Sequence, residues 1–370
     1  MKKGMAGKDL PDSYEGWERL ARENLDDERF RYVASTAGYG DAADANVQAY
    51  KQWRIVPRVL RDVSNRSAST SVLGTRMAAP LLLSPVRGLG YIYRDGDVAV
   101  ARVASELGVP FVVSTFASAS IESVAKASGS GSRWFQLYPG KDREVMRSLV
   151  QRAEASGYTA VVVTIDKADN YPHYDGPRGH EFERHGYESY FSDPAFRAKF
   201  GGQPEKQFDA AWRLWKDIRL AQGLSLSELG TIVKQTKLPV VVKGILNPED
   251  ARLAEEQGAA GVVVSNHGGR SLDGVVPALD ALPAVRKAVR PGFTVLLDSG
   301  IRSGTDIVKA LALGADAAMV GKAYALALGA AGEEGVRKAL GGLVGEFEAA
   351  MALCGALRPG DIGPDSVVHA

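Results

Sequence analysis

Short apolar runs rich in valine, isoleucine and leucine alternate with amphipathic stretches along most of the chain. Helical spacing of apolar residues at 96–108, 143–157, 248–258 and 304–314 predicts helices, several of which end at a glycine suited to a C-cap. The apolar runs, which predict buried strands, lie at about 79–86, 111–115, 134–138, 160–166, 239–244, 261–265, 294–298 and 317–320. Eight strands, each followed by a helix, close a (β/α)8 TIM barrel, so the pattern predicts an α/β fold in one domain over 1–370.

Two segments depart from this alternation. Residues 13–35 carry helical spacing, and we expect 1–60 to form a helical lid and a link to the barrel. Residues 167–225 interrupt the pattern after the fourth strand with a polar, aromatic stretch that becomes helical again around 193–216. An insertion of this length in a compact domain is typical of an active-site lid.

The composition narrows the class of protein. A net charge of +1, from 45 basic and 44 acidic residues, gives no basic face for nucleic acid. No apolar run reaches the ~20 residues that cross a bilayer, and the N-terminus lacks the apolar core of a signal peptide, so we expect a cytoplasmic protein without a membrane partner. Cys354 is the only cysteine, which excludes an internal disulfide and a thiolate metal cluster.

The stretch 262–273 changes abruptly from a buried strand to chemistry-bearing residues. His267 and Arg270 follow the sixth predicted strand, and Gly268 and Gly269 allow a tight turn there. Barrel enzymes keep their catalytic groups at the carboxyl ends of the strands, so these two residues are candidates for the reacting centre. The alternative is that both side chains only satisfy carbonyls of the turn.

Nearly every other predicted strand also ends in polar residues. After the last two strands, Gly300 and Gly321 would allow close approach of a ligand, and Arg302 and Lys322 would supply positive charge for a phosphate. There is no Gly-x-Gly-x-x-Gly after a strand and no P-loop, which disfavours a Rossmann dinucleotide or ATP site. No group of residues has metal-ligand spacing, so we expect no metal.

At these residues the chain resembles the FMN-dependent α-hydroxy acid oxidase and dehydrogenase family, which includes glycolate oxidase, lactate oxidase and lactate 2-monooxygenase. The resemblance runs over nearly the whole length. Its most specific segments are 265–270, 135–138, 238–244 and 298–302, which read SNHGGR, FQLY, LPVVVKG and DSGIR. Residues 190–200, YFSDPAFRAKF, are most similar to the lactate 2-monooxygenase branch.

The resemblance implies FMN as cofactor and assigns roles to the strand-end residues. The implied cofactor-binding residues are Pro85, Val86, Ser114, Gln136, Thr164, Lys243, Ser265, Asp298, Gly300, Arg302, Gly321 and Lys322. His267 would take a proton from the substrate, and Asp166 would stabilise the resulting imidazolium. Arg270 would bind the substrate carboxylate, while Tyr32 and Tyr138 would hydrogen-bond the substrate.

Two positions depart from the family pattern. His173 stands where a second carboxylate-binding arginine is usual, and Arg87 stands where alanine or glycine is usual. Arg87 would either fill the pocket or supply the missing cation from another direction; the alternatives are that it faces solvent or pairs with Asp95. Lys322 replaces an arginine, which keeps the charge and loses bidentate geometry.

The resulting functional prediction is FMN-dependent oxidation of a 2-hydroxy acid, or a related hydroxy or amino compound, to the 2-oxo product. The electrons would pass to O2, with or without oxidative decarboxylation. The alternatives are a non-redox barrel isomerase acting on a phosphorylated substrate and a catalytically impaired flavin-binding protein. The resemblance also implies a homotetramer or larger homo-oligomer.

Overall fold

The computed structural model describes residues 10–167, 182, 184–221 and 223–370. Eight parallel strands form a closed barrel in the order β10-β11-β4-β5-β6-β7-β8-β9, which confirms the predicted TIM barrel. The strands are β4 Leu81–Leu83, β5 Phe111–Ser114, β6 Arg133–Leu137, β7 Val161–Thr164, β8 Val240–Ile245, β9 Gly261–Val264, β10 Thr294–Leu297 and β11 Ala317–Val320. The first strand is shorter than the predicted 79–86 because Pro80 and Pro85 have no N–H to donate to a neighbouring strand.

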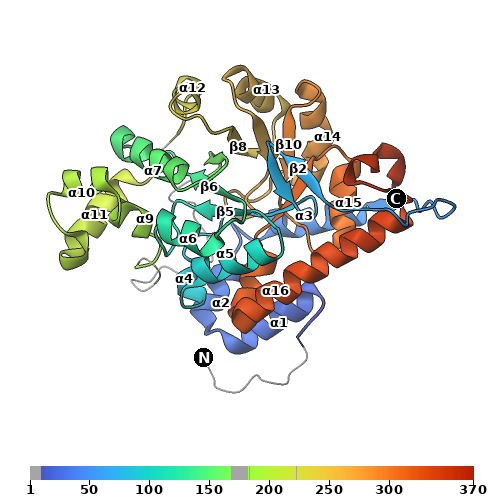
Figure 1. Ribbon diagram of the computed structural model, residues 1–370, viewed down its shortest axis with the longest axis horizontal. Coiled ribbons are helices and arrows are strands. Elements are labelled where there is room, and N and C mark those ends of the chain that lie inside the picture. Colours follow the sequence, from blue (N-terminus) through green and yellow to red (C-terminus); the bar gives the residue numbers. More distant parts are fainter. Residues whose placement is uncertain (1–9, 168–181, 183, 222) are drawn as a thin grey trace.

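Helices pack around this sheet (Figure 1). They are α4 Leu89–Ile92, α5 Gly96–Glu106, α6 Ile121–Ser128, α7 Arg143–Ala155, α12 Leu226–Lys234, α13 Pro248–Glu256, α14 Ala278–Ala288, α15 Gly304–Ala312 and α16 Lys322–Leu353. Polar caps define where several of them begin. Asp142 accepts hydrogen bonds from Glu144 N and Val145 N at the start of α7, and Ser303 forms a capping box with Asp306 at the start of α15.

The interior of the barrel is filled by side chains. Alternate strand residues form an apolar cluster of their own, separate from the layer between strands and helices; it includes Leu82, Val112, Trp134, Val162, Val241, Val263, Leu296 and Met319. The hairpin β2 Thr70–Val72 and β3 Thr75–Met77 packs against the same cluster through Val72 and Met77. The barrel is therefore a packed core whose polar groups gather at its mouth.

From residue 10 onward, the N-terminal region forms the helices α1 Tyr14–Asn24, α2 Asp27–Ala34 and α3 Asp41–Lys51. α1 and α2 lie beside the long helix α16 (Figure 1). Gly38 and Gly40 have positive φ angles of 54° and 92°, and they turn the chain from α2 into α3. The chain then continues through β1 Trp53–Ile55, which pairs with β12 Val367–His369 near the C-terminus. Two 3-10 turns, η2 Pro359–Asp361 and η3 Pro364–Ser366, precede β12.

The insertion after the fourth barrel strand contains α9 Glu188–Phe191, α10 Pro194–Phe200, the 3-10 turn η1 Pro204–Lys206 and α11 Phe208–Ile218. These helices project from one side of the barrel (Figure 1). Their aromatic side chains pack on one another, as in the stacked pair Phe191 and Phe196 with ring centroids 5.6 Å apart. Trp215 extends this packing to the barrel, with its ring edge-on to Phe116 at 5.6 Å. No helix among the described residues is long and apolar enough to cross a membrane.

Candidate active site

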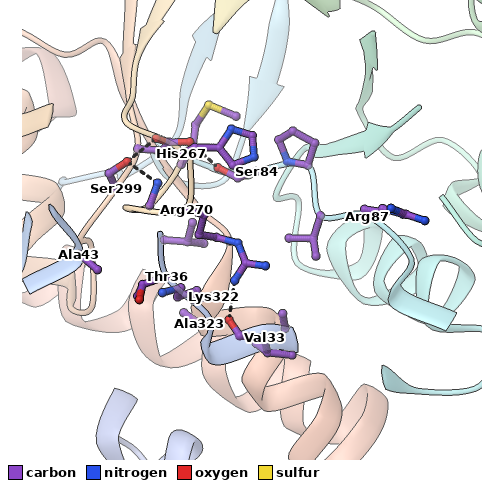
Figure 2. A pocket seen from close by; sticks show the side chains of 18 of the residues that line it. Val33, Thr36, Ala43, Ser84, Arg87, His267, Arg270, Ser299, Lys322 and Ala323 are labelled. Carbon is purple, nitrogen blue, oxygen red and sulfur yellow. Dashed lines mark hydrogen bonds between the residues drawn. The ribbon is translucent and has the colours of Figure 1, made fainter. Parts of the chain in front are cut away.

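A cavity of about 440 Å³ opens at the carboxyl ends of the barrel strands. Its walls come from the strand ends, the N-terminal helices and the insertion, and Figure 2 shows part of them. The predicted site residues that line it are Tyr32, Pro85, Val86, Arg87, Tyr138, Lys243, His267, Arg270, Asp298, Gly300, Arg302, Gly321 and Lys322. Residues distant in the sequence thus meet at the position where barrel enzymes carry out their chemistry.

His267 is held against Asp166 at the mouth. The Nδ1 atom of His267 lies 2.8 Å from Oδ1 of Asp166, so the ring is paired with a carboxylate and not with a carbonyl of its turn. His267 has a left-handed φ of 59°, which is rare for a side chain of this size. Ser265 Oγ accepts a hydrogen bond from His267 N at 3.0 Å, and Ser299 Oγ accepts one from Gly268 N at 3.0 Å. These bonds hold the turn in its strained shape.

The electrostatics of this pair favour a neutral imidazole beside an ionised carboxylate. Burial, together with the charge of Lys243, lowers the pKa of His267, although Asp166 opposes the shift. Burial raises the pKa of Asp166, but its interaction with His267, which includes their hydrogen bond, and the positive charge of Lys243 outweigh burial, so this pKa lies below its usual value. A neutral His267 that donates from Nδ1 to Asp166 leaves Nε2 with a lone pair, which is the form a general base requires.

Lys243 places a buried positive charge beside this pair. Its Nζ lies 3.1 Å from Asp298 Oδ2 and donates a hydrogen bond to Ser265 Oγ at 2.8 Å. Burial lowers the pKa of Lys243, but Asp298 and Asp166 outweigh burial and raise it above its usual value. The ammonium therefore stays charged at the centre of the mouth at every pH near neutrality.

The neighbouring strand ends carry buried polar atoms that have no hydrogen-bond partner among the described residues. Ser114 Oγ and Thr115 N donate to Gln136 Oε1 at 3.3 Å and 3.1 Å, which fixes the amide. Gln136 Nε2 and Thr164 Oγ1 are buried, and neither has a hydrogen-bond partner within the described part of the chain. Buried polar atoms are nearly always paired in folded proteins, so both atoms point to a polar ligand at this position.

The last two strand ends form a cationic recess. A Cβ on Gly300 would lie 2.8 Å from Asn46 O, whereas one on Gly321 would meet nothing closer than 3.6 Å. No protein atom therefore fills the space beside Gly321, and a ligand can occupy it. The guanidinium carbon of Arg302 lies 4.2 Å from the ring centroid of Tyr14. Burial and the charges of Arg270 and Arg302 lower the pKa of Lys322 to about 7.

Arg270 joins the catalytic turn to the N-terminal helices. Its Nη1 donates to the carbonyls of Val33 and Ser35 at 3.0 Å each, and its Nη2 donates to Tyr32 O at 2.9 Å. These carbonyls lie at the C-terminal end of α2, where a positive charge is favourable. Figure 2 shows the guanidinium of Arg270 extending from the turn toward Val33.

Two tyrosines flank this arginine in the cavity. The hydroxyl of Tyr32 donates a hydrogen bond to Arg87 O. The ring of Tyr138 stacks on Phe116 with centroids 5.0 Å apart. Burial, reinforced by Asp166, raises the pKa of Tyr138 well above its usual value, so its hydroxyl remains a hydrogen-bond donor.

Arg87 points away from both His267 and Arg270 (Figure 2). Its Nη2 donates to His185 O at 3.2 Å, and its guanidinium carbon lies 4.5 Å from the ring centroid of Phe182. Asp95, which the sequence offered as a partner, lies 3.8 Å from Arg94. The other departure from the family pattern, His173, lies outside the described residues.

Sequence reasoning missed several residues that line the cavity, among them Phe116, Lys167, Arg219 and Leu220. Lys167 directly follows Asp166, so its position after a strand could have identified it. Arg219 follows α11 in the insertion, and no spacing in the sequence relates it to the barrel mouth. Among the described residues, no cluster of histidine, cysteine and carboxylate side chains could hold a metal ion.

Comparison with known proteins identifies the family. The sequence profile of the FMN-dependent dehydrogenase family matches residues 21–369. The chain is 40% identical over 356 residues to an L-lactate oxidase of Alicycliphilus denitrificans, with 95% of this chain and 94% of that protein covered. It is 38% identical over 347 residues to 2-hydroxyacid oxidase 1 of Mus musculus, with 92% and 91% covered. A crystal structure of mandelate oxidase with benzoyl-formic acid superposes with a TM-score of 0.83 at 35% identity, covering 97% of this chain and 98% of that one.

The chain therefore belongs to the FMN-dependent dehydrogenase family, with FMN as its cofactor, and its relatives in that family include an L-lactate oxidase and a 2-hydroxyacid oxidase. The cavity fits this cofactor. On its wall, the open space at Gly321 beside Arg302 and Lys322 suits a phosphate. The buried polar atoms of Gln136 and Thr164, on strand ends next to the residues that line the cavity, suit the polar edge of a flavin ring. Family membership favours a flavin enzyme over the isomerase considered from the sequence.

Proposed function

We propose that the protein is a 2-hydroxy acid oxidase in which His267 is the base. The hydrogen bond of 2.8 Å between Asp166 and His267, which lines the cavity, is the observation that supports this assignment most directly. His267 Nε2 takes a proton from the substrate, and the adjacent carboxylate stabilises the imidazolium that forms. Arg270 binds the substrate carboxylate, and Tyr32 and Tyr138 hydrogen-bond the substrate.

FMN would lie across the mouth of the barrel. Bound FMN supplies the acceptor for the two electrons that leave the carbinol carbon. The residues proposed to hold it are Pro85, Val86, Ser114, Gln136, Thr164, Lys243, Ser265, Asp298, Gly300, Arg302, Gly321 and Lys322. Lys243, whose positive charge is stabilised by Asp298, would stabilise the electron-rich reduced form of the flavin ring.

Molecular oxygen is the proposed electron acceptor. An oxidase would convert the 2-hydroxy acid and O2 into the 2-oxo acid and hydrogen peroxide, whereas a monooxygenase would form the shortened acid, CO2 and water. Residues 190–200 are the basis for proposing the lactate 2-monooxygenase branch. The helical lid at 1–60, the insertion lid at 167–225, a homotetramer and a cytoplasmic location remain predictions from the sequence.

Anaerobic mixing of the purified holoenzyme with a panel of 2-hydroxy acids tests the proposal. Glycolate, lactate, mandelate and larger hydroxy acids would each be added while the visible absorbance of the flavin is followed. We expect at least one acid to bleach the flavin, and product analysis in air would then separate 2-oxo acid with peroxide from the decarboxylated acid. Failure of every acid to reduce the flavin would favour the impaired flavin-binding alternative.

A further inference from the structure

Three consecutive backbone N–H groups of the turn that carries His267 donate to serine hydroxyls. Ser265 Oγ accepts the hydrogen bond from His267 N at 3.0 Å. Ser299 Oγ accepts two, from Asn266 N at 3.3 Å and from Gly268 N at 3.0 Å. Figure 2 shows Ser299 beside this turn. The backbone on both sides of the proposed base is therefore bonded to a single hydroxyl, that of Ser299.

Both hydroxyls are also bonded to the buried ion pair of Lys243 and Asp298. Ser265 Oγ accepts from Lys243 Nζ at 2.8 Å, and Ser299 Oγ donates to Asp298 Oδ1 at 2.8 Å. The other carboxylate oxygen, Asp298 Oδ2, lies 3.1 Å from Lys243 Nζ. A hydroxyl has one proton and two lone pairs, so one donated and two accepted bonds occupy the hydroxyl of Ser299 completely. This hydroxyl connects the ion pair to the turn and has no bonding capacity left for a substrate.

The backbone of Ser299 adopts a conformation that costs free energy. Its φ is 77°, in the left-handed region that is unfavourable for any residue with a Cβ. Glycine adopts such a φ freely, so a glycine at position 299 would relieve the strain. Strained residues persist where the surrounding structure holds them, and they concentrate at functional sites. The hydrogen bonds of the hydroxyl, and not the stability of the backbone, therefore explain a serine at this position.

Other contacts hold the general shape of the turn without Ser299. The side-chain amides of Asn46 and Asn266 exchange two hydrogen bonds of 2.8 Å each, and Asn266 Oδ1 accepts a further bond from Gly269 N at 3.1 Å. Arg270 is bonded to carbonyls at the end of α2. Loss of the Ser299 hydroxyl should consequently leave the turn folded and Arg270 in place, while the backbone next to the base gains freedom.

We propose that Ser299 is a positioning residue for the reaction, because its hydroxyl fixes the backbone on both sides of His267 and thereby holds the imidazole in one orientation toward the substrate. This inference rests on the proposed function, in which His267 is the base. A base must lie within hydrogen-bond distance of the proton that it takes, and a displacement of about 1 Å can lower a rate by about 10²-fold. Binding of the substrate carboxylate at Arg270 should change little.

Two substitutions separate the hydroxyl of Ser299 from the strain of its backbone. Ser299→Ala removes the hydroxyl and keeps a Cβ in the left-handed conformation, whereas Ser299→Gly removes the hydroxyl and relieves the strain. Ser299→Gly should therefore resist guanidinium denaturation at least as well as Ser299→Ala. Holoenzymes with matched FMN contents would be mixed anaerobically with the best 2-hydroxy acid of the panel. We expect the rate constant of flavin reduction to fall by about 10–10²-fold in both variants.

Two further measurements do not depend on turnover. The dissociation constant of the 2-oxo acid product, obtained from the change in flavin absorbance on titration, should stay close to the wild-type value because Arg270 keeps its contacts. Hydrogen exchange at the amides of residues 266–268, followed by mass spectrometry, should become faster in both variants because two of these amides lose their acceptor.

Ser271→Ala is the matched control. This serine lies in the same loop, and its buried Oγ has no hydrogen-bond partner within the described part of the chain. Its removal should leave the reduction rate constant, the product affinity and the exchange at residues 266–268 at their wild-type values.

Flavin reduction at the wild-type rate in Ser299→Gly would overturn the inference, since that variant lacks the hydroxyl and carries no strain. An equal loss of rate in Ser271→Ala, or unchanged hydrogen exchange at residues 266–268 in both Ser299 variants, would also overturn it. If Ser299→Ala is too unstable to purify, Ser299→Gly decides alone. These results leave the proposed function intact, because they are measured against a wild-type flavin that a 2-hydroxy acid reduces. If no 2-hydroxy acid reduces the wild-type flavin, the proposed function fails instead, and the inferred role of Ser299 fails with it.

Discussion

At the scale of single residues, the site depends on buried charged side chains. Burial raises the free energy of each charged form, and neighbouring opposite charges lower it. Lys243 and Asp298 lie 3.1 Å apart with almost no exposure, and either charge alone would be strongly unfavourable there. Burial and Lys243 lower the pKa of His267, and the interactions with His267 and Lys243 lower the pKa of Asp166. The buried ammonium of Lys243 thus contributes to the protonation states of both members of the proposed catalytic pair.

This arrangement predicts the pH dependence of the reaction. Because the pKa of His267 lies below 6.5, the neutral base persists below that pH. The midpoint of the acid limb of the kcat/KM profile should therefore lie below pH 6.5. Asp166→Asn removes a charge that raises this pKa, so the limb should move to lower pH. Loss of imidazolium stabilisation should also reduce kcat/KM by about 10²–10⁴-fold. An acid limb that stays in place in the variant would contradict the assignment.

Lys322 predicts a pH-dependent affinity for FMN. Burial and the charges of Arg270 and Arg302 lower its pKa to about 7 without a phosphate present, so the apoprotein holds this lysine largely neutral at pH 8.5. FMN should therefore bind more weakly at pH 8.5 than at pH 7.5, and Lys322→Arg should reduce that difference because arginine stays charged. Quenching of FMN fluorescence during titration of apoprotein measures the dissociation constant at each pH. Equal pH dependence in both proteins would refute the role of Lys322.

At the scale of elements, the catalytic turn also organises the N-terminal helices. Asp273 accepts hydrogen bonds from Tyr39 N at 2.7 Å, Gly40 N at 3.1 Å and Ala42 N at 2.8 Å, and so caps the start of α3. Arg270, three residues earlier, binds the carbonyls at the end of α2. The loop that carries His267 therefore fixes the entry to the cavity from two sides.

Removal of this cap should weaken the fold measurably. Hydrogen bonds from Ala42 N and its neighbours lower the pKa of Asp273, so its contribution is present above the unfolded pKa and is lost as the pH falls through the folded value. Asp273→Ala should lower the free energy of unfolding at pH 7 by about 1 kcal/mol, and the difference should shrink below about pH 4. Leu272→Ala, at an exposed neighbour, is the control in guanidinium denaturation. Equal stability of both variants would argue against the cap.

The elements and the reacting centre could be predicted because their signals are local. Runs such as Val161–Thr164 identify barrel strands directly, and the turn after Val264 carries His267 and Arg270 together. The place of Arg219 could not be predicted, since it depends on how α11 packs through Trp215 onto Phe116. The direction of Arg87 likewise depends on contacts with the insertion, above all with His185.

At the scale of the whole molecule, stability and chemistry lie at opposite ends of the barrel. The inward-facing cluster around Trp134 and Leu82 and the hairpin β2–β3 form an apolar base. Trp134 Nε1 donates to Thr75 Oγ1 at 2.9 Å, which attaches that hairpin to the barrel. The ionised groups discussed above gather at the mouth. The packed base can therefore hold the strained turn at His267 in place.

Substitution at the base should affect stability without affecting catalysis. Trp134→Phe removes the hydrogen bond to Thr75 and leaves a small cavity, so the free energy of unfolding should fall by about 1–3 kcal/mol. KM for the best 2-hydroxy acid should stay at the wild-type value under conditions where the variant is folded. A several-fold change in KM would show that the base and the mouth are coupled.

The rate of flavin reduction in a single anaerobic turnover tests the central claim, that His267 takes a proton from a 2-hydroxy acid at the barrel mouth. Wild-type holoenzyme and His267→Gln would be mixed with the best substrate of the panel in a stopped-flow instrument after their FMN contents have been matched. We predict a reduction rate constant about 10²–10⁴-fold lower in the variant. Reduction at the wild-type rate in His267→Gln would contradict the account.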